Sequence, residues 1–193
     1  AWSTMKVPIA VAVSRATGGS NDAMRQAITA SDNDSAQQMW RSLGSPSTAG
    51  EKTHAVLSDG GSGATQVQTQ VTRSGFSSFG QTDWSLTNSA RFAASLPCLN
   101  GAAPVVELMG QIAGDQQWGI GSVPGSAFKG GWGPQGSGGY LVRQLGIMSL
   151  PNGGKVPLAI ATLPSNGDFG TGTTQLTQIA QWAAKNLKTG ASC

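Results

Sequence analysis

The sequence predicts a mixed α/β domain of the α+β type, with helices first, an antiparallel sheet next and one closing helix. Three observations predict this order. Apolar residues recur at helical spacing through the first half, three segments of strand composition follow, and an amphipathic helical segment ends the chain. Because 193 residues suffice to bury one core, we expect a single domain over 1–193. Its helical part should span about 4–115, and its sheet and last helix about 118–193.

The first third of the chain is expected to contain short helices separated by polar turns. The spacing of apolar residues predicts helices over Thr4–Arg15 and Asp22–Thr29. Asp34 or Ser35 is expected to cap a third helix, because short polar side chains bind free N–H groups there, and Gly44 is expected to end it.

Residues 45–83 are polar and rich in glycine, and within them only TAGEKTHAVLSD indicates a helix. The next helix is expected from Ser85 onward, with Asp83 as its N-cap. The segment VVELMGQI indicates one more short helix.

Three strands are expected in the second half: SAFKGGWG, GYLVRQLGIMSL and KVPLAIATLPS. The Pro-Asn-Gly-Gly connection at 151–154 predicts a hairpin between the last two strands. The closing helix is TTQLTQIAQWAAKNLKTG, with Thr173 or Thr174 as its cap. Its predicted core face consists of Leu176, Ile179, Ala183 and Leu187.

Composition excludes several classes of function. The net charge of +3 is spread thinly, and no Lys/Arg cluster would follow a phosphate backbone, so no nucleic-acid partner is expected. No apolar stretch reaches the length of a membrane span. With one histidine, His54, and two cysteines in no metal-like spacing, neither a metal site nor a cofactor is expected.

The two cysteines, Cys98 and Cys193, are widely spaced in a chain poor in lysine and glutamate. This pattern favours an exported protein with one disulfide, and two free thiols are the alternative. The chain has no signal peptide and does not begin with Met, so we read it as a processed or trimmed chain.

The opening Ser-Thr-Met-Lys segment contains the first candidate for chemistry. Ser3 and Lys6 are neighbours on a helix because they are three residues apart. The helix dipole favours negative charge developing on a serine at the N-terminus, and a desolvated lysine can accept that serine's proton. A Ser-x-x-Lys spacing by itself is common, and a surface lysine is its ordinary explanation.

Two further motifs follow in order: Ser-Asp-Asn at 31–33 and Lys-Gly-Gly at 129–131. The first motif precedes an apolar helix, the second lies between helices, and the third begins the sheet. In these motifs the sequence resembles the penicillin-recognising serine hydrolases, that is, class A β-lactamases and penicillin-binding proteins. Within them it is most similar to class A-like proteins of actinobacterial cell envelopes. The resemblance extends over essentially the whole chain.

The resemblance implies a role for each motif residue. Ser3 would be the acylated nucleophile and Lys6 would accept its proton. Ser31 would pass a proton to the leaving nitrogen, and Asn33 would hydrogen-bond the substrate amide and position Lys6. Asp32 would brace the loop.

The third motif would contribute the charge and the space that the substrate needs. Lys129 would supply positive charge near the substrate carboxylate, and Gly130 and Gly131 would leave room along the strand. The backbone N–H groups of Ser3 and Trp132 would form the oxyanion hole. The expected ligands are β-lactams or peptidoglycan-like fragments, in a periplasmic or envelope-associated protein whose membrane anchor, if any, lies outside this sequence.

The chain departs from the class A pattern where a loop glutamate would hydrolyse the acyl-enzyme. The segment QVTRSGFSSFGQTDWSLTNSARF contains no glutamate, Glu51 comes too early and Glu107 too late. We therefore expect slow deacylation and no efficient β-lactamase. The short interval between Ser3 and Ser31 predicts a reduced helical part, and the family's N-terminal strands are expected to be missing, which leaves a sheet edge unpaired.

Three functions remain open from the sequence. The first is an exported serine acyl-transfer protein with a long-lived acyl-enzyme. The second is a catalytically inactive envelope binding module with the same fold. The third is an esterase-like serine hydrolase.

Overall fold

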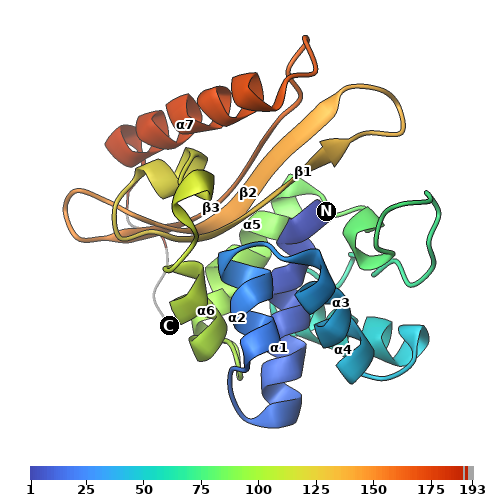
Figure 1. Ribbon diagram of the computed structural model, residues 1–193. Coiled ribbons are helices and arrows are strands. Elements are labelled where there is room, and N and C mark those ends of the chain that lie inside the picture. The colour runs from blue at the N-terminus through green and yellow to red at the C-terminus, as the bar shows by residue number, and fades with distance from the viewer. Residues whose placement is uncertain (189, 191–193) are drawn as a thin grey trace.

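The computed structural model describes residues 1–188 and 190 and has three layers (Figure 1). A three-stranded antiparallel sheet lies between α7 on one face and the helical part on the other, where α5 contacts β2 and β3. The α+β fold class predicted from the sequence is confirmed. The N-terminus lies beside β1, so the first residues of the chain meet the start of the sheet.

Seven α-helices form within the described residues, most of them in the first half of the chain. Their bounds are α1 (Lys6–Thr17), α2 (Asp22–Thr29), α3 (Asn33–Ser42), α4 (Pro46–Asp59), α5 (Leu86–Ser95), α6 (Ala103–Met109) and α7 (Phe169–Asn186). Short 3₁₀ segments are η1 (Trp2–Met5), η2 (Phe79–Gln81), η3 (Leu96–Cys98), η4 (Gly114–Gln116) and η5 (Gly119–Ser122).

The predicted caps of three helices were wrong, each by a few residues. Asp32 rather than Asp34 or Ser35 caps α3, and its carboxylate accepts a hydrogen bond from the N–H of Ser35 at 2.7 Å. At α7, Asp168 is the cap, so that helix begins several residues before the predicted threonines. Any short acceptor three residues before a free N–H can cap, so the sequence alone offers several choices.

The cap of α5 is Ser85, whose hydroxyl accepts a hydrogen bond from the N–H of Asn88 at 3.1 Å. Asp83, the expected cap, has an electrostatic role instead. It raises the pKa of Arg143 against the larger lowering that burial causes, which leaves the guanidinium with a pKa of about 10. Arg143 donates hydrogen bonds to Trp84 and Ser89 and so ties β2 to the start of α5.

The sheet consists of β1 (Ala127–Pro134), β2 (Tyr140–Ser149) and β3 (Lys155–Thr162), in that order. The hairpin predicted at 151–154 joins β2 to β3, and Gly153 there takes the positive φ that the turn requires. In the β1–β2 register, Lys129 faces Leu145 and Gly131 faces Arg143. All three strands match the predicted segments closely.

The core is centred on α1, in which all residues from Lys6 to Ser14 are buried. Helices surround α1, which explains why it is apolar on every side rather than on one stripe. The core face predicted for α7 was wrong in one position. Leu176, Ala180 and Ala183 are buried, whereas Ile179 is 39% exposed.

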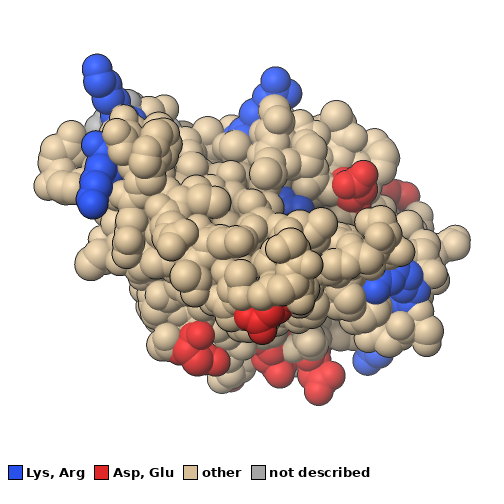
Figure 2. Space-filling view, turned by 90° about the horizontal axis from the view of Figure 1, so that it is seen from above, with Lys and Arg blue, Asp and Glu red and all other residues tan. Residues whose placement is uncertain are grey.

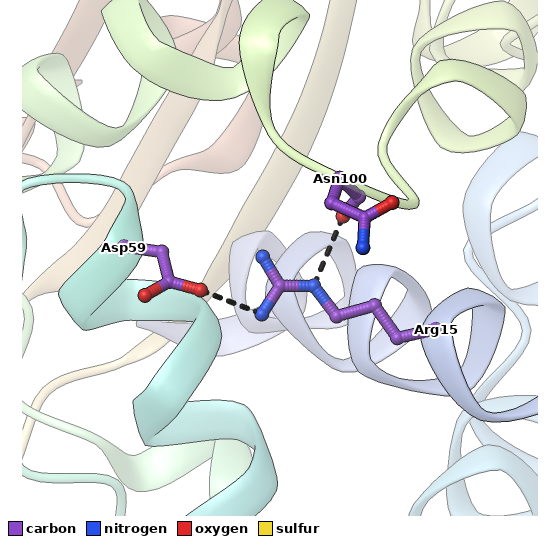
Figure 3. A network of polar contacts seen from close by, with 3 residues as sticks. All are labelled: Arg15, Asp59 and Asn100. Carbon is purple, nitrogen blue, oxygen red and sulfur yellow. Dashed lines mark hydrogen bonds and ion pairs between the residues drawn. The ribbon is translucent and has the colours of Figure 1, made fainter.

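Arg15 anchors the far end of α1 to two other segments (Figure 3). Its guanidinium donates to the carboxylate of Asp59 at the end of α4 at 2.8 Å, and to the carbonyl of Asn100 before α6 at 2.9 Å. The pair with Asp59 is partly exposed, so it contributes little to stability, on the order of 0.5 kcal/mol. It joins the end of α1 to the end of α4.

The face of the molecule seen from above is mostly uncharged (Figure 2). Its Lys, Arg, Asp and Glu side chains are scattered, mainly toward the edges. No single described helix is long and apolar enough to cross a membrane, and α5–η3 joined to α6 reaches that length and composition only across a bend of 116°. Cys193 lies outside the described residues, so its pairing with Cys98 stays a prediction.

Candidate active site

Ser3 and Lys6 lie on consecutive short elements at the head of the central helix. Ser3 belongs to η1, and Lys6 is the first residue of α1. Ser3 is half-buried and lines a cleft, whereas Lys6 is only 1% exposed. Lysine is seldom buried without partners, so the contacts of its ammonium group define this site.

The loop between α2 and α3, together with the first residue of α3, supplies every hydrogen-bond acceptor of Lys6 within the described residues. The Nζ atom donates to the carbonyl of Ser31 at 2.5 Å, to Oδ1 of Asn33 at 2.9 Å and to the carbonyl of Asp32 at 3.2 Å. The hydroxyl of Ser31 lies 3.4 Å from the same nitrogen. Three good acceptors match the three protons of an ammonium group, so the hydrogen-bonding capacity of charged Lys6 is fully used.

Ser31 also accepts a hydrogen bond from a second buried lysine, Lys129. The Nζ of Lys129 on β1 donates to Oγ of Ser31 at 2.9 Å and to the carbonyl of Gly130 at 3.1 Å. Because Oγ accepts from a lysine, the proton of the Ser31 hydroxyl is available for another acceptor. The fold thus brings together residues from the first, second and third sequence motifs.

The backbone is strained where these groups meet. Ser31 has φ +59° and Trp2, next to Ser3, has φ +53°, both in the left-handed region that non-glycine residues avoid. Such residues cost about 1–3 kcal/mol each and cluster at functional sites. The strained Ser31 turn directs both its carbonyl and its hydroxyl toward Lys6.

Burial alters the proton affinity of both lysines. Burial lowers the pKa of Lys6 from 10.5 to about 8, and the negative charge of Asp32 offsets part of the effect. Burial also lowers the pKa of Lys129 well below its usual range, and the charge of Lys6 lowers it further. A lysine with a pKa near 8 has an appreciable neutral fraction at physiological pH and can therefore accept a proton.

Glycines on β1 allow the strand to lie directly against η1. A Cβ atom on Gly131 would be 2.9 Å from the backbone nitrogens of Ser3 and Thr4, and one on Gly133 would be 2.5 Å from the ring of Trp2. On the other face of the strand, a Cβ on Gly130 would approach the ring of Trp118 to 3.0 Å. The Ser3 N–H is therefore close to the strand that carries Trp132, and the oxyanion hole expected from these two residues stays a prediction.

The cleft in front of Ser3 has a volume of about 750 Å³. Trp132, which was expected to contribute an oxyanion-hole N–H, and Tyr140 both line it. Their rings belong to a cluster with Phe169, whose ring centroid is 5.3 Å from that of Trp132 and 6.3 Å from that of Tyr140.

The opposite wall of the cleft is a loop closed by Gln81, a residue that sequence analysis missed. Oε1 of Gln81 accepts hydrogen bonds from Thr72 Oγ1 at 2.6 Å and from the N–H of Arg73 at 2.7 Å. Its Nε2 donates to the carbonyls of Arg73, Phe76 and Ser77. The loop therefore wraps around one uncharged side chain, and no local pattern marks such a glutamine in advance.

Arg73 joins this loop to the other wall of the cleft. Its guanidinium donates to the carbonyl of Pro134 at the end of β1 at 2.8 Å and lies 4.8 Å from the ring centroid of Phe76. The rings of Phe76 and Trp2 meet edge to face at 5.0 Å. One end of the cleft is closed in this way.

The cleft contains no glutamate among the described residues, and Asp34 is its one carboxylate. The described residues that line the cleft therefore present one carboxylate, on α3, and none on the loop opposite α3. No group of three or more His, Cys, Asp or Glu residues in the described part of the chain could hold a metal ion.

Solved structures match the chain over almost its whole length. A class A β-lactamase from Bacteroides cellulosilyticus is 13% identical, with 95% of this chain and 82% of that chain covered at a TM-score of 0.74. The TLA-1 extended-spectrum β-lactamase is 14% identical, with 95% and 83% covered at a TM-score of 0.73. The chromosome-encoded β-lactamase of Vibrio parahaemolyticus is 14% identical, with 98% and 85% covered at a TM-score of 0.70.

This chain has the fold of the class A β-lactamases. No protein-family model and no curated protein matches the sequence. At these levels of identity the class A β-lactamase fold is shared, and the chemistry has to be argued from the residues that line the cleft.

Proposed function

We propose that this chain is a serine acyl-transfer protein that forms an acyl-enzyme on Ser3 with β-lactams or peptidoglycan-like amides and esters, and that it deacylates slowly. One observation supports this most directly. Two buried lysines, Lys6 and Lys129, meet at the hydroxyl of Ser31 beside a cleft that Ser3 lines. Burying two cations without a carboxylate partner is costly, and a purely structural role would not require it.

Acylation would use these groups in sequence. Neutral Lys6 takes the proton of Ser3 while Oγ of Ser3 attacks the substrate carbonyl, and the N–H groups of Ser3 and Trp132 stabilise the oxyanion. Ser31 then donates its hydroxyl proton to the leaving nitrogen as the C–N bond breaks. Lys6 returns a proton to Ser31, to which its nitrogen lies within 3.4 Å.

Deacylation would lack its usual catalyst. Hydrolysis of the acyl-enzyme needs a base that activates water, and the cleft offers only the exposed Asp34. We therefore expect the acyl-enzyme to accumulate. This is the property of a penicillin-binding protein rather than of an efficient β-lactamase.

Intact-mass measurement after mixing with a penicillin tests the proposal. The wild type should gain the mass of one drug molecule, and Ser3→Ala should gain none. Labelling that persists in Ser3→Ala would disprove the assignment of the nucleophile. An adduct that disappears within seconds would show that some group replaces the missing glutamate.

A catalytically inactive binding module is the second candidate, and one observation favours it. The Ser3 hydroxyl makes no hydrogen bond to any residue of the described part of the chain, and Lys6 is held by the 31–33 loop. Ligand binding that is unchanged in Ser3→Ala and Lys6→Ala, without any adduct on the folded wild type, would favour this candidate.

An esterase-like activity on the same nucleophile is a further alternative. Turnover of chromogenic short-chain esters above the Ser3→Ala background would support it. Export, attachment to the cell envelope and the Cys98–Cys193 disulfide remain part of the proposal, and mass measurement with and without a reductant tests the disulfide.

A further inference from the structure

The cleft continues well beyond Ser3, along α3. One face of this helix lines it from the motif residue Asn33 to the turn before α4, through Gln37 and Arg41. These positions follow helical spacing, four residues apart in each step. Because a helix rises 1.5 Å per residue, the eight residues from Asn33 to Arg41 correspond to about 12 Å of groove. We call this part of the cleft the α3 arm.

The α3 arm has a buried floor and two separate walls. Its floor is the ring pair of Trp40 and Phe79, 3% and 2% exposed, whose centroids are 5.3 Å apart. The wall opposite α3 contains Thr69, which is seated on α4, because a Cβ on Gly50 would lie 2.4 Å from its methyl group. Val71 continues this wall and is 60% exposed, so its side chain offers apolar surface to a ligand in the arm.

The α3 arm stays open because the loop opposite α3 bonds to itself. Gln81 satisfies the polar groups of residues 72–77 from within the loop. The loop therefore needs no hydrogen bonds from the side chains of Gln37 or Arg41, and neither side chain has one to a described residue. Two polar side chains and an exposed valine thus remain available to a ligand.

A positive charge, that of Arg41, lies at the end of the α3 arm farther from Ser3. Arg41 is exposed to the cleft, and the only ion pair in the described part of the chain joins Arg15 to Asp59 elsewhere. Asp34 lies two helical turns nearer to the reaction site. A guanidinium without a partner binds a carboxylate through two hydrogen bonds.

We propose that the α3 arm binds the acyl chain of an extended, peptide-like substrate whose distal end carries a carboxylate that pairs with Arg41. An extended peptide spans about 3.3 Å per residue, so three to four units span the ~12 Å of the α3 arm from Asn33 to Arg41. Gln37 and Thr69 pair with the peptide groups, and Val71 and the Trp40–Phe79 floor contact the side chains. This inference rests on the proposed acyl transfer at Ser3 for its kinetic test.

Three thiobenzyl esters test the α3 arm: succinyl-trialanine, acetyl-trialanine and acetyl-alanine, with the same alanine enantiomer at the ester in all three. Ser3 forms the new acyl C–O bond, the C–S bond breaks, and benzyl thiol leaves with the proton. In the wild type, kcat/KM for succinyl-trialanine should exceed that for acetyl-trialanine about tenfold. Equal values for all three esters would overturn the proposal.

Two variants and a control locate the effect. Arg41→Gln should bring the succinyl-to-acetyl ratio close to 1, whereas Arg25→Gln, which removes an exposed arginine from α2, should leave the ratio as in the wild type. Gln37→Trp should narrow the α3 arm and lower kcat/KM for both trialanine esters more than for acetyl-alanine. A succinyl preference that survives Arg41→Gln would disprove the pairing.

Direct binding separates this inference from the proposed function. The dissociation constant of succinyl-trialanine amide is measured by calorimetry in the Ser3→Ala background, alone and combined with Arg41→Gln or Arg25→Gln, because these proteins have no nucleophile for the amide to acylate. Binding that weakens about tenfold in Arg41→Gln but not in Arg25→Gln would support the α3 arm even if no ester acylated Ser3. Failure of every ester together with normal amide binding would contradict the proposed function alone, and absence of amide binding would overturn the α3 arm.

Discussion

At the residue scale, the site depends on two lysines that the fold keeps out of water. Lys6 and Lys129 are 1% and 0% exposed, and they share one hydroxyl, that of Ser31. Ser-x-x-Lys spacing indicated that Lys6 would lie beside Ser3. It did not indicate that Lys6 would be held by the 31–33 loop, because that contact depends on a strained turn far away in the sequence.

The pKa of Lys6 sets an expected pH dependence of acylation. Its pKa of about 8 means that the neutral fraction rises tenfold per pH unit below pH 8 and levels off above it. The acylation rate with a penicillin should therefore rise about tenfold from pH 6 to pH 7 and reach a plateau above pH 8. Stopped-flow or quenched mass measurement gives the rate.

The matched control for this prediction is Lys185→Ala, which removes an exposed lysine from α7 and should leave the profile unchanged. A rate that is constant between pH 6 and pH 8 would mean that Lys6 is not the base.

At the element scale, the close contact between β1 and η1 shapes the site. Strand β1 carries Lys129 to Ser31 and Trp132 to the cleft. Its glycines at 131 and 133 remove the side chains that would separate the strand from η1. The sequence predicted the strand and its glycines. Only the folded chain shows that Gly131 faces backbone atoms, which cannot move aside as a flexible side chain would.

Gly131→Ala should therefore displace β1 from Ser3. A shift of this kind is expected to reduce acylation about 100-fold and to cost about 1–3 kcal/mol of stability. The control is Gly136→Ala in the β1–β2 turn, where a Cβ would meet no atom within 4 Å and no positive φ is involved. Acylation rate and thermal midpoint measure both effects, and equal behaviour of the two variants would refute the close-contact explanation.

At the scale of the whole molecule, burying cations at the site should make stability depend on pH. Lys6 has a pKa of about 8 in the folded state and 10.5 when exposed, so between these values the unfolded chain binds more protons. The free energy of unfolding should therefore rise with pH from about 8 to about 10.5, by on the order of 3 kcal/mol from Lys6. Lys129 contributes in the same direction.

Urea unfolding at pH 7.5, 9 and 10 measures this rise, with Lys6→Met as the comparison. The variant keeps most of the side-chain volume without the charge, so its stability should depend less on pH over this range. Identical slopes for the wild type and Lys6→Met would contradict a lowered pKa for Lys6.

Sequence alone predicted most of the helices, the three strands and the three ordered motifs, because apolar spacing, turn residues and short motifs are local signals. Tertiary structure decided what is not local. Packing between distant segments selects the residue that caps each helix and leaves Ile179 facing water. It also lets Gln81 close the loop and keeps the α3 arm open. The same packing contacts also determine the pKa of Lys6, because desolvation depends on all the atoms packed around a charge and not only on the residue that carries it.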